Sequence, residues 1–210
     1  MRITAEAQVA TRNRILQEAT RLFTTEGWER TTTRRIAEAA GIAAGTLFNY
    51  FKSKETLAEA LMAEAIESGD AAGEFSPPLE LSLEEDLFSF VWSGLKSLRP
   101  LRPFLPDAAE TILSPLRQFS SSSAGDDLRV RHLEAAEHIM ARHGVATPLP
   151  AVSLQLYWTL YLGVFGYWTR DESPNQEDTM ALLDQSLHLF AATLSRSKAP
   201  STLEPKSEEP

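Results

Sequence analysis

The chain of 210 residues has no cysteine, and none of its apolar runs is long enough for a membrane-spanning helix, which needs roughly 18 to 20 residues. Disulfides, thiolate metal ligands and thiol nucleophiles are therefore excluded. The N-terminus lacks the apolar core of a secretory signal. The longest apolar-rich stretch, residues 154–168, is interrupted by Gln155, Thr159 and two glycines, which favours a buried helix. We expect a cytoplasmic protein that does not enter a membrane.

Positive charge is also scarce, with 20 Lys and Arg against 29 Asp and Glu and a net charge of -9. Taken over the whole chain, this balance argues against nucleic-acid binding, because DNA affinity depends on neutralising phosphates. The charge is unevenly distributed, however. Residues 1–54 carry a net charge of +4 and residues 55–210 a net charge of -13. The cationic character lies in the first quarter, and the acidic remainder would repel DNA.

Apolar residues recur with helical period along most of the chain, and no window alternates as a strand would, which predicts an all-α protein. A break at residues 69–78 predicts an N-terminal domain over 9–69 and a larger domain over 70–196. The polar, proline-rich residues 197–210 are expected to form a disordered tail. The expected helices cover residues 10–26, 33–40, 43–51, 54–68, 82–98, 107–119, 126–143, 151–169 and 176–195.

Two of these helices, 33–40 and 43–51, are short and are joined by a tight turn at Gly41, which is typical of a helix-turn-helix. With the apolar residues turned inward, the outer face carries short hydrogen-bonding side chains and cations, as insertion into a major groove requires. Small residues at 43–45 would let the backbone approach phosphates closely. The exposed set is Thr33, Arg34, Ala43, Ala44, Thr46, Asn49 and Tyr50, with Lys54 just beyond.

Residues Gly27 to Leu57 read G-W-x-x-T-T-T-x-x-I-A-x-A-A-G-I-x-x-G-T-L-F-N-Y-F-x-S-K-E-x-L. This run closely resembles the N-terminal DNA-binding domain of TetR-family transcriptional regulators. The resemblance covers about residues 10–60, with the helix-turn-helix motif at about 32–51. It implies about nine helices, arranged as a three-helix DNA-binding domain and a larger helical domain for ligand binding and dimerisation. It also implies a homodimer formed through the last two helices.

The resemblance implies phosphate contacts from Thr33, Thr46, Tyr50 and Lys54, and base contacts from Arg34 and Asn49. Phe48 stands where the family usually has a tyrosine, and Ala44 stands where a lysine or glutamine is common. Both departures remove contacts, so the expected affinity depends more on the arginines, namely Arg34, Arg35, Arg12 and Arg14. The alternative is that single residues have no DNA role: Tyr50 would be a partly buried aromatic, Lys54 a solvated charge, and Arg34 and Arg35 part of a solvated face. The expected DNA-binding set is Thr33, Arg34, Ala44, Gly45, Thr46, Phe48, Asn49, Tyr50 and Lys54.

In the second half, residues 154–168 contain six aromatic side chains, too many for one apolar stripe, so this helix must be covered on two sides. One side is expected to join the last helix and its symmetry mates in a dimer interface, and the other to face a ligand cavity. A mostly apolar lining predicts a small hydrophobic or aromatic ligand. Core packing explains most of these residues equally well. The expected lining is Phe88, Trp92, Phe104, Ile112, Tyr157, Tyr161 and Phe165.

A metal site deserves consideration because Glu134 and His138 share a helix face, but the di-iron Glu-x-x-His spacing is not met, and a solvated face is favoured. We expect no metal and no cofactor. The chain has no G-x-S-x-G elbow and no phosphate-binding glycine loop, so we expect that it is not an enzyme.

The function predicted from these observations is that of a homodimeric repressor, released from a near-palindromic DNA operator by a small ligand. The ligand would bind among helices five to eight and shift the fourth helix. Two alternatives make different predictions. A helical enzyme or ligand carrier that had lost DNA recognition would have a neutral or acidic first quarter and a disrupted motif. A dimeric adaptor would bind protein through its aromatic helix.

Overall fold

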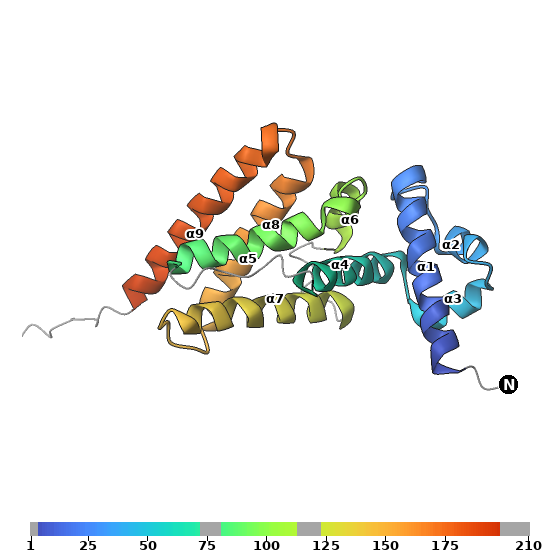
Figure 1. Cartoon of the computed structure of the whole chain (residues 1–210), viewed down its shortest axis with the longest axis horizontal. Helices are drawn as coiled ribbons and strands as arrows, with labels where there is room; N and C mark the ends of the chain where they lie inside the picture. Colours follow the sequence, from blue (N-terminus) through green and yellow to red (C-terminus); the bar gives the residue numbers. More distant parts are fainter. Residues whose placement is uncertain (1–3, 72–80, 113–122, 198–210) are drawn as a thin grey trace, which may run out of the picture.

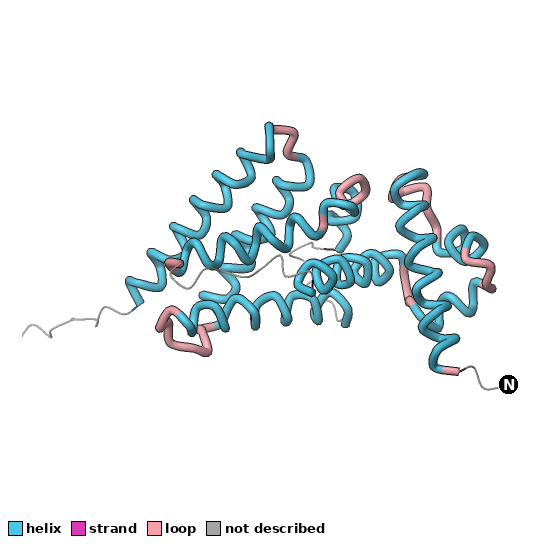
Figure 2. Tube along the Cα trace, viewed as in Figure 1, coloured by secondary structure: helices cyan, strands magenta, loops and turns pink. Residues whose placement is uncertain are grey.

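The computed structural model describes residues 4–71, 81–112 and 123–197, which fold into helices without a strand (Figures 1 and 2). The prediction of an all-α protein is therefore confirmed. In the described residues, two short 3-10 helices, η1 (Arg99–Leu101) and η3 (Pro174–Gln176), lie between α-helices. The α-helices in this part of the chain are α1 (Ala5–Glu26), α2 (Thr33–Ala39), α3 (Ala44–Tyr50), α4 (Lys54–Ala71), α5 (Leu83–Ser97), α6 (Leu105–Ile112), α7 (Ser123–Arg142), α8 (Ala151–Arg170) and α9 (Glu177–Ser197).

The first three helices form a small head, in which α1 buries Ile15, Leu16, Ala19, Leu22 and Phe23. Helix α1 begins at Ala5, five residues before the expected start. The Thr4 side chain caps it by accepting a hydrogen bond from the Ala7 amide at 3.3 Å. Residues 5–10 are mostly good helix formers but are exposed, so they show no apolar period from which the sequence could predict a helix there.

Helix α4 connects the head to the larger helical body (Figure 1). Its first half buries Leu57 and Ala58, and it packs against α1 as well as against α5, α6 and α7. Arg12 of α1 forms an ion pair with Glu64 of α4, and the Arg12 guanidinium lies 5.6 Å from the centre of the Phe51 ring. The same helix thus contacts both parts of the molecule.

A second connection between head and body is aromatic. Phe104, in the turn before α6, is completely buried, and its ring centre lies 5.0 Å from that of Phe23 and 6.4 Å from that of Trp28. Trp28 stacks nearly parallel to Phe104 and also contacts Phe23 at 5.0 Å. Phe104 therefore lies in a core that the head and body share.

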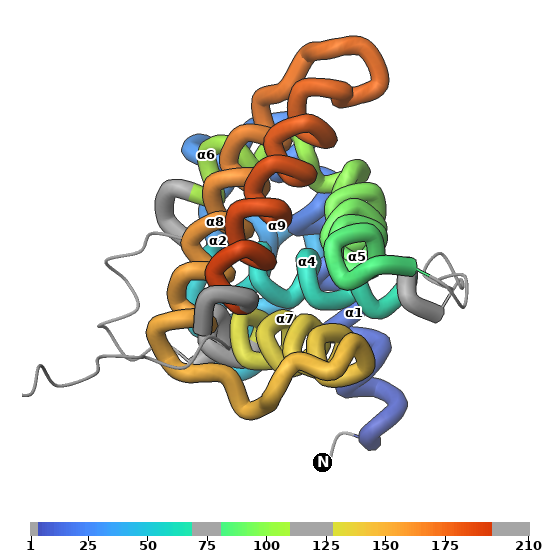
Figure 3. Tube along the Cα trace, turned by 90° about the vertical axis from the view of Figure 1, so that its left-hand side faces the viewer, coloured from blue at the N-terminus to red at the C-terminus, as the bar shows by residue number. Residues whose placement is uncertain are grey.

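In the body, α9 packs against α8 and α5, and α7 packs against α4 and α5. Figure 3 shows this arrangement from the side opposite the head, with α8 and α9 next to each other and α7 below them. The start of α5 is held by a capping box, in which the Ser82 amide donates to the Glu85 carboxylate at 2.8 Å and the Glu85 amide donates to the Ser82 hydroxyl at 3.3 Å.

The turn between α8 and α9 is organised by Asp171, whose carboxylate accepts hydrogen bonds from the Ser173 amide at 2.8 Å and the Thr179 amide at 3.0 Å. The Thr179 hydroxyl donates to the same group. Burial opposes ionisation of Asp171, but these hydrogen bonds outweigh it and lower the pKa of Asp171 to about 2. Arg102 donates to the Trp168 carbonyl in the last turn of α8 at 3.1 Å and to the Asp171 carbonyl just after the helix.

The other expected helices lie within a few residues of the observed ones. The expected helix 107–119 corresponds to α6, which begins earlier, at Leu105, while residues 113–119 are outside the described part of the chain. Most of the expected break at 69–78, and the expected tail apart from its first residue, are also outside it. Within the described ranges, no helix combines the length and the apolar character that crossing a membrane demands.

Candidate functional site

The three consecutive threonines at the start of α2 have different roles in the structure. Thr31 is completely buried, and its hydroxyl donates to the Gly27 oxygen at 2.8 Å and to the Leu22 oxygen at 3.2 Å. Thr32 is the N-cap of α2, since its hydroxyl accepts from the Arg35 amide at 3.2 Å. Thr33 is therefore the first helical residue and remains partly exposed, so its hydroxyl is not needed as the cap.

The turn between α2 and α3 depends on Gly41, which has a φ of +66°, a conformation that side chains with a Cβ disfavour. The Gly41 amide donates to the Glu38 oxygen at 3.1 Å, and the Ile42 amide donates to the Ala37 oxygen at 3.0 Å. These bonds end α2, and α3 begins at Ala44 after a very short connection. The structure thus has two short helices joined by a tight glycine turn, as the sequence predicts.

The inward faces of α2 and α3 bury Ile36, Ala37, Leu47 and Phe51. All nine residues of the expected DNA-binding set are at least partly exposed on this unit or at the start of α4. Arg34 is open to solvent, with 84% of its side chain exposed. The exposed members are Arg34, Ala44, Gly45, Phe48 and Asn49, and the half-buried members are Thr33, Thr46, Tyr50 and Lys54.

The two arginines of α2 make only surface ion pairs. Arg34 lies 3.3 Å from Glu38 one turn later, and Arg35 lies 3.3 Å from Glu26 at the end of α1. Exposed pairs of this kind contribute about 0 to 1 kcal/mol, so another acceptor can replace the glutamate at little cost. Arg12 differs, because its guanidinium is held by the ion pair with Glu64 of α4 and by its position over the Phe51 ring.

Lys54 also has a role that the sequence did not indicate. Its ammonium group donates to the Trp28 carbonyl at 2.9 Å and lies 4.2 Å from the centre of the Trp28 ring. A cation over an indole ring is favourable, and the contact links the start of α4 to the turn after α1. Lys54 therefore helps to hold the head together, and its expected phosphate contact stays a prediction.

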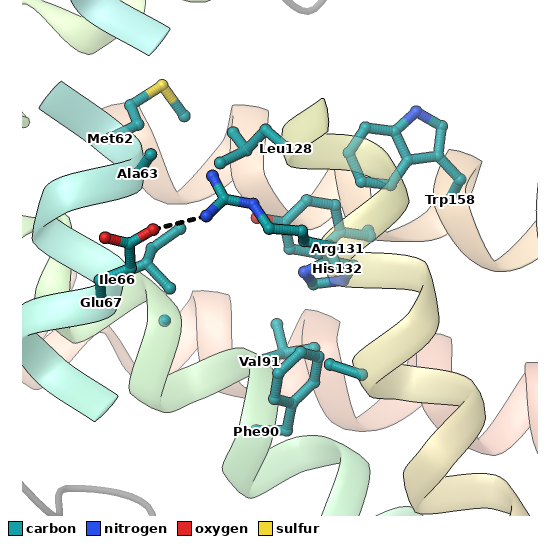
Figure 4. A pocket seen from close by; sticks show the side chains of 13 residues that line it. Met62, Ala63, Ile66, Glu67, Phe90, Val91, Leu128, Arg131, His132 and Trp158 are labelled. Atoms are coloured by element: carbon teal, nitrogen blue, oxygen red, sulfur yellow. Dashed lines mark hydrogen bonds and ion pairs between the residues drawn. The ribbon is translucent and has the colours of Figure 1, made fainter. Parts of the chain in front are cut away.

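The body contains a cavity of about 140 Å³ between α4, α5, α7 and α8 (Figure 4). Apolar and aromatic side chains make up most of its wall, and Glu67 and Arg131 are the charged residues in it. The lining consists of Met62, Ala63, Ile66, Glu67, Phe90, Val91, Gly94, Leu128, Arg131, His132, Ala135, Trp158 and Tyr161.

This wall differs from the expected lining. Tyr161 lines the cavity as expected. Tyr157 does not line it, but lines a second, much smaller space between α8 and α9. Phe104 instead packs in the core shared with the head. On α5 the wall is formed by Phe90, Val91 and Gly94, and Phe88 and Trp92 pair with each other, their ring centres 6.5 Å apart.

Two expected lining residues remain. Phe165 is buried beside Trp168, with 5.9 Å between the ring centres. The side chain of Ile112 is outside the part that the structure describes. The contribution of α4 to the wall was missed, because its apolar residues read as ordinary core positions.

His132 of α7 lies at the centre of an aromatic cluster. Its ring centre is 4.0 Å from that of Tyr161, 5.0 Å from that of Phe90 and 5.7 Å from those of Tyr157 and Trp158. Its Nε2 is 3.1 Å from the Tyr157 hydroxyl. Burial lowers the pKa of His132 to about 3, so the imidazole is neutral near pH 7. Burial also raises the pKa of Tyr161, which therefore keeps its proton and can donate a hydrogen bond.

At the edge of the cavity, Arg131 of α7 forms an ion pair with Glu67 of α4, with 2.5 Å between nitrogen and oxygen (Figure 4). Both side chains are more than half exposed. Glu134 and His138, which the sequence raised as metal ligands, are exposed on α7. Across the described residues, no group of three or more His, Cys, Asp or Glu is placed to hold a metal ion.

Two family descriptions match the chain. Residues 15–61 match bacterial regulatory proteins of the tetR family, and residues 87–206 match the C-terminal domain described as tetracyclin repressor-like. The second match alone covers more than half of the chain.

Individual proteins are similar over different lengths. The chain is 39% identical over 56 residues to the HTH-type transcriptional repressor KstR2 of Mycolicibacterium smegmatis, which is 27% of either protein. It spans 29% of the uncharacterized regulator YvkB of Bacillus subtilis, with 43% identity over 54 residues and 26% of this chain covered. A TetR regulator structure from Rhodococcus sp. RHA1 has a TM-score of 0.69 at 19% identity, covering 87% of this chain and 96% of the other, which establishes similarity of fold.

Proposed function

Because the chain belongs to the TetR family of bacterial regulatory proteins, we propose that it is a transcriptional repressor that binds a near-palindromic operator as a homodimer and is released by a small ligand. Family membership also makes it a regulator rather than an enzyme. A repressor of this kind acts on DNA in the cytoplasm. The observation that carries the proposal is the helix-turn-helix of α2 and α3, with its exposed polar face in the cationic quarter of the chain.

Arg34 is proposed to read a base and Tyr50 to contact a phosphate. The Arg34 side chain is held only by a surface pair, so it can reach a guanine edge, where a bidentate contact contributes about 1 to 3 kcal/mol of discrimination. Asn49, exposed on α3, suits adenine. The acidic body does not favour DNA, so the field of the molecule orients it with the head towards the duplex.

The direct test is fluorescence anisotropy of DNA from the upstream region of the gene, titrated at several salt concentrations. Arg34→Ala is expected to weaken specific binding by about ten-fold or more, while binding to unrelated DNA changes little. Tyr50→Phe removes only the hydroxyl and is expected to weaken both specific binding and binding to unrelated DNA. Lys96→Ala is the matched control, because it removes one exposed positive charge from α5 in the body. Sequence preference that is absent, or unchanged in Arg34→Ala, would contradict the assignment.

The homodimer is proposed to form through α8 and α9. Helix α8 exposes Val152, Leu156 and Tyr167, which lie close to one face of the helix, and α9 exposes Leu189. Leu189 is 62% exposed and Val152 81% exposed. A second copy that covers this surface would bury side chains that water otherwise contacts. It would also place two α3 helices on one duplex, as a near-palindrome requires.

Light scattering coupled to size exclusion tests this interface. Leu156→Arg combined with Leu189→Arg is expected to give a folded monomer. Val130→Arg, a similar change at an apolar residue of α7 that is 50% exposed, is the control and should leave a dimer. A monomeric wild type, or a dimeric double variant, would refute the proposed interface.

Ligand binding is proposed to reach the head through α4. Met62, Ala63 and Ile66 line the cavity, and Glu64 on the same turns holds Arg12 of the head. A ligand that moves this segment therefore acts on the base of the head directly, and a coupling of about 1 to 3 kcal/mol would change operator affinity about five-fold to 150-fold. Operator titrations with and without ligand measure this coupling.

A further inference from the structure

The size and lining of the cavity restrict what it can bind. Its volume of about 140 Å³ is close to that of an engineered cavity of about 150 Å³ that stays dry and binds benzene. Phe90, Val91 and Trp158 supply an apolar wall for one ring. The cavity therefore suits a molecule with a single aromatic ring better than a multi-ring compound.

Two polar side chains at this cavity, Tyr161 and Arg131, can donate hydrogen bonds to a ligand. The Tyr161 hydroxyl keeps its proton. The guanidinium of Arg131 has five N–H groups, and one of its nitrogens contacts Glu67. The remaining N–H groups can donate to a second acceptor. Because Arg131 is about half exposed, its exchange from Glu67 to another carboxylate costs little.

A cationic ligand fits this cavity less well than an anionic one. A cation could bind an aromatic face or the Glu67 carboxylate. However, the Trp158 ring already has the Arg129 guanidinium 5.8 Å from its centre, the Tyr161 ring is 4.0 Å from that of His132, and Glu67 is already paired with Arg131. Arg129 and Arg131 also place two positive charges near the cavity against the one carboxylate of Glu67.

We propose that the ligand is a single-ring aromatic carboxylate, whose ring enters the cavity and whose carboxylate binds Arg131 in place of Glu67. This inference rests on the proposed function, because it identifies the chemical class of the ligand and how it acts. Glu67 belongs to α4, three residues after Glu64. When the carboxylate of the ligand binds Arg131, Glu67 of α4 loses its ion pair with α7. This change occurs one turn from Glu64, which holds Arg12 of the head.

Calorimetric titration of the full chain with benzoate tests the ligand class. Benzamide is the neutral match, benzylammonium the cationic one, and acetate the acid without a ring. Benzoate is expected to bind about ten-fold or more tightly than each of the other three, as a charge-assisted hydrogen bond and a buried ring together predict. Benzamide or benzylammonium binding as tightly as benzoate would overturn the proposal, and so would the absence of benzoate binding.

Two variants test the exchange of partners. Arg131→Gln is expected to weaken benzoate binding by about ten-fold or more and to leave benzamide binding unchanged. Glu67→Gln removes the competitor and is expected to strengthen benzoate binding. Arg21→Gln is the control, since Arg21, like Arg131, is about half exposed and forms an ion pair, with Glu18 on α1 at 2.8 Å. Unaltered benzoate affinity in Arg131→Gln, or weaker affinity in Glu67→Gln, contradicts the exchange.

Operator binding without ligand is measured separately, so the two proposals can fail independently. A chain that binds its operator but not benzoate overturns the ligand class and leaves the proposed DNA-binding function. A chain that binds benzoate through Arg131 but does not bind DNA specifically supports the ligand class and overturns the proposed function.

Discussion

Replacing Phe104 with alanine tests whether this residue belongs to the core between head and body. The side chain is completely buried against Phe23 and Trp28. Loss of its burial costs about 1.5 to 3 kcal/mol, and the cavity that remains raises the expected loss to about 3 to 5 kcal/mol. Because helix α4 still connects the two parts, the variant should fold and unfold at a lower denaturant concentration.

Urea unfolding followed by circular dichroism measures this loss as a change in the free energy of unfolding. Phe88→Ala is the matched control, because Phe88 is only partly buried beside Trp92 and should cost clearly less. If Phe104 instead lined the ligand site, its substitution would weaken benzoate binding while changing stability little. A loss of stability below about 1 kcal/mol would refute the assignment to the shared core.

Three further outcomes follow from the local geometry. Asp171 has a pKa of about 2 in the folded chain against 3.8 ordinarily. Its contribution of about 2 kcal/mol to the free energy of unfolding is therefore present above pH 4 and is lost as the pH falls towards 2. Asp171→Asn should reduce this pH dependence in urea unfolding between pH 2 and 6. Gly41→Ala should cost about 1 to 2 kcal/mol because of its positive φ, whereas Gly45→Ala, within a helix and facing open space, should stabilise the chain in the same assay. Lys54→Met removes the contacts with Trp28 and should lower the free energy of unfolding by about 1 kcal/mol in low salt, where a purely solvated lysine would leave it unchanged.

The helices and the helix-turn-helix were predictable because their signals are local. Gly41 ends one helix and Ala43 precedes the next, and the spacing of Ile36, Ala37 and Leu47 identifies the buried face without knowledge of the rest of the chain. The start of α1 was mispredicted because its first residues are exposed, so burial leaves no period there.

The cavity could not be predicted, because apolar residues of a buried helix look alike in sequence whether they line a cavity or fill a core. On α5, the cavity is lined by Phe90 and Val91, whereas Phe88 and Trp92 face elsewhere. Which side of α5 faces the cavity depends on where α7 and α8 pack against it. The roles of Lys54 and Arg12 were missed for a related reason, since their partners lie 26 and 52 residues away.

The sequence by itself determined the helical class, the glycine turn between two short helices, the cationic first quarter and the residues expected to meet DNA. These properties depend on neighbours within a few turns, which a linear pattern records. The tertiary structure decided that Phe104 joins the head to the body, that α4 forms part of the cavity wall, and that Arg131 meets Glu67 at its edge. Such contacts join segments far apart in the chain, so they depend on how the helices pack and not on the period of any one of them.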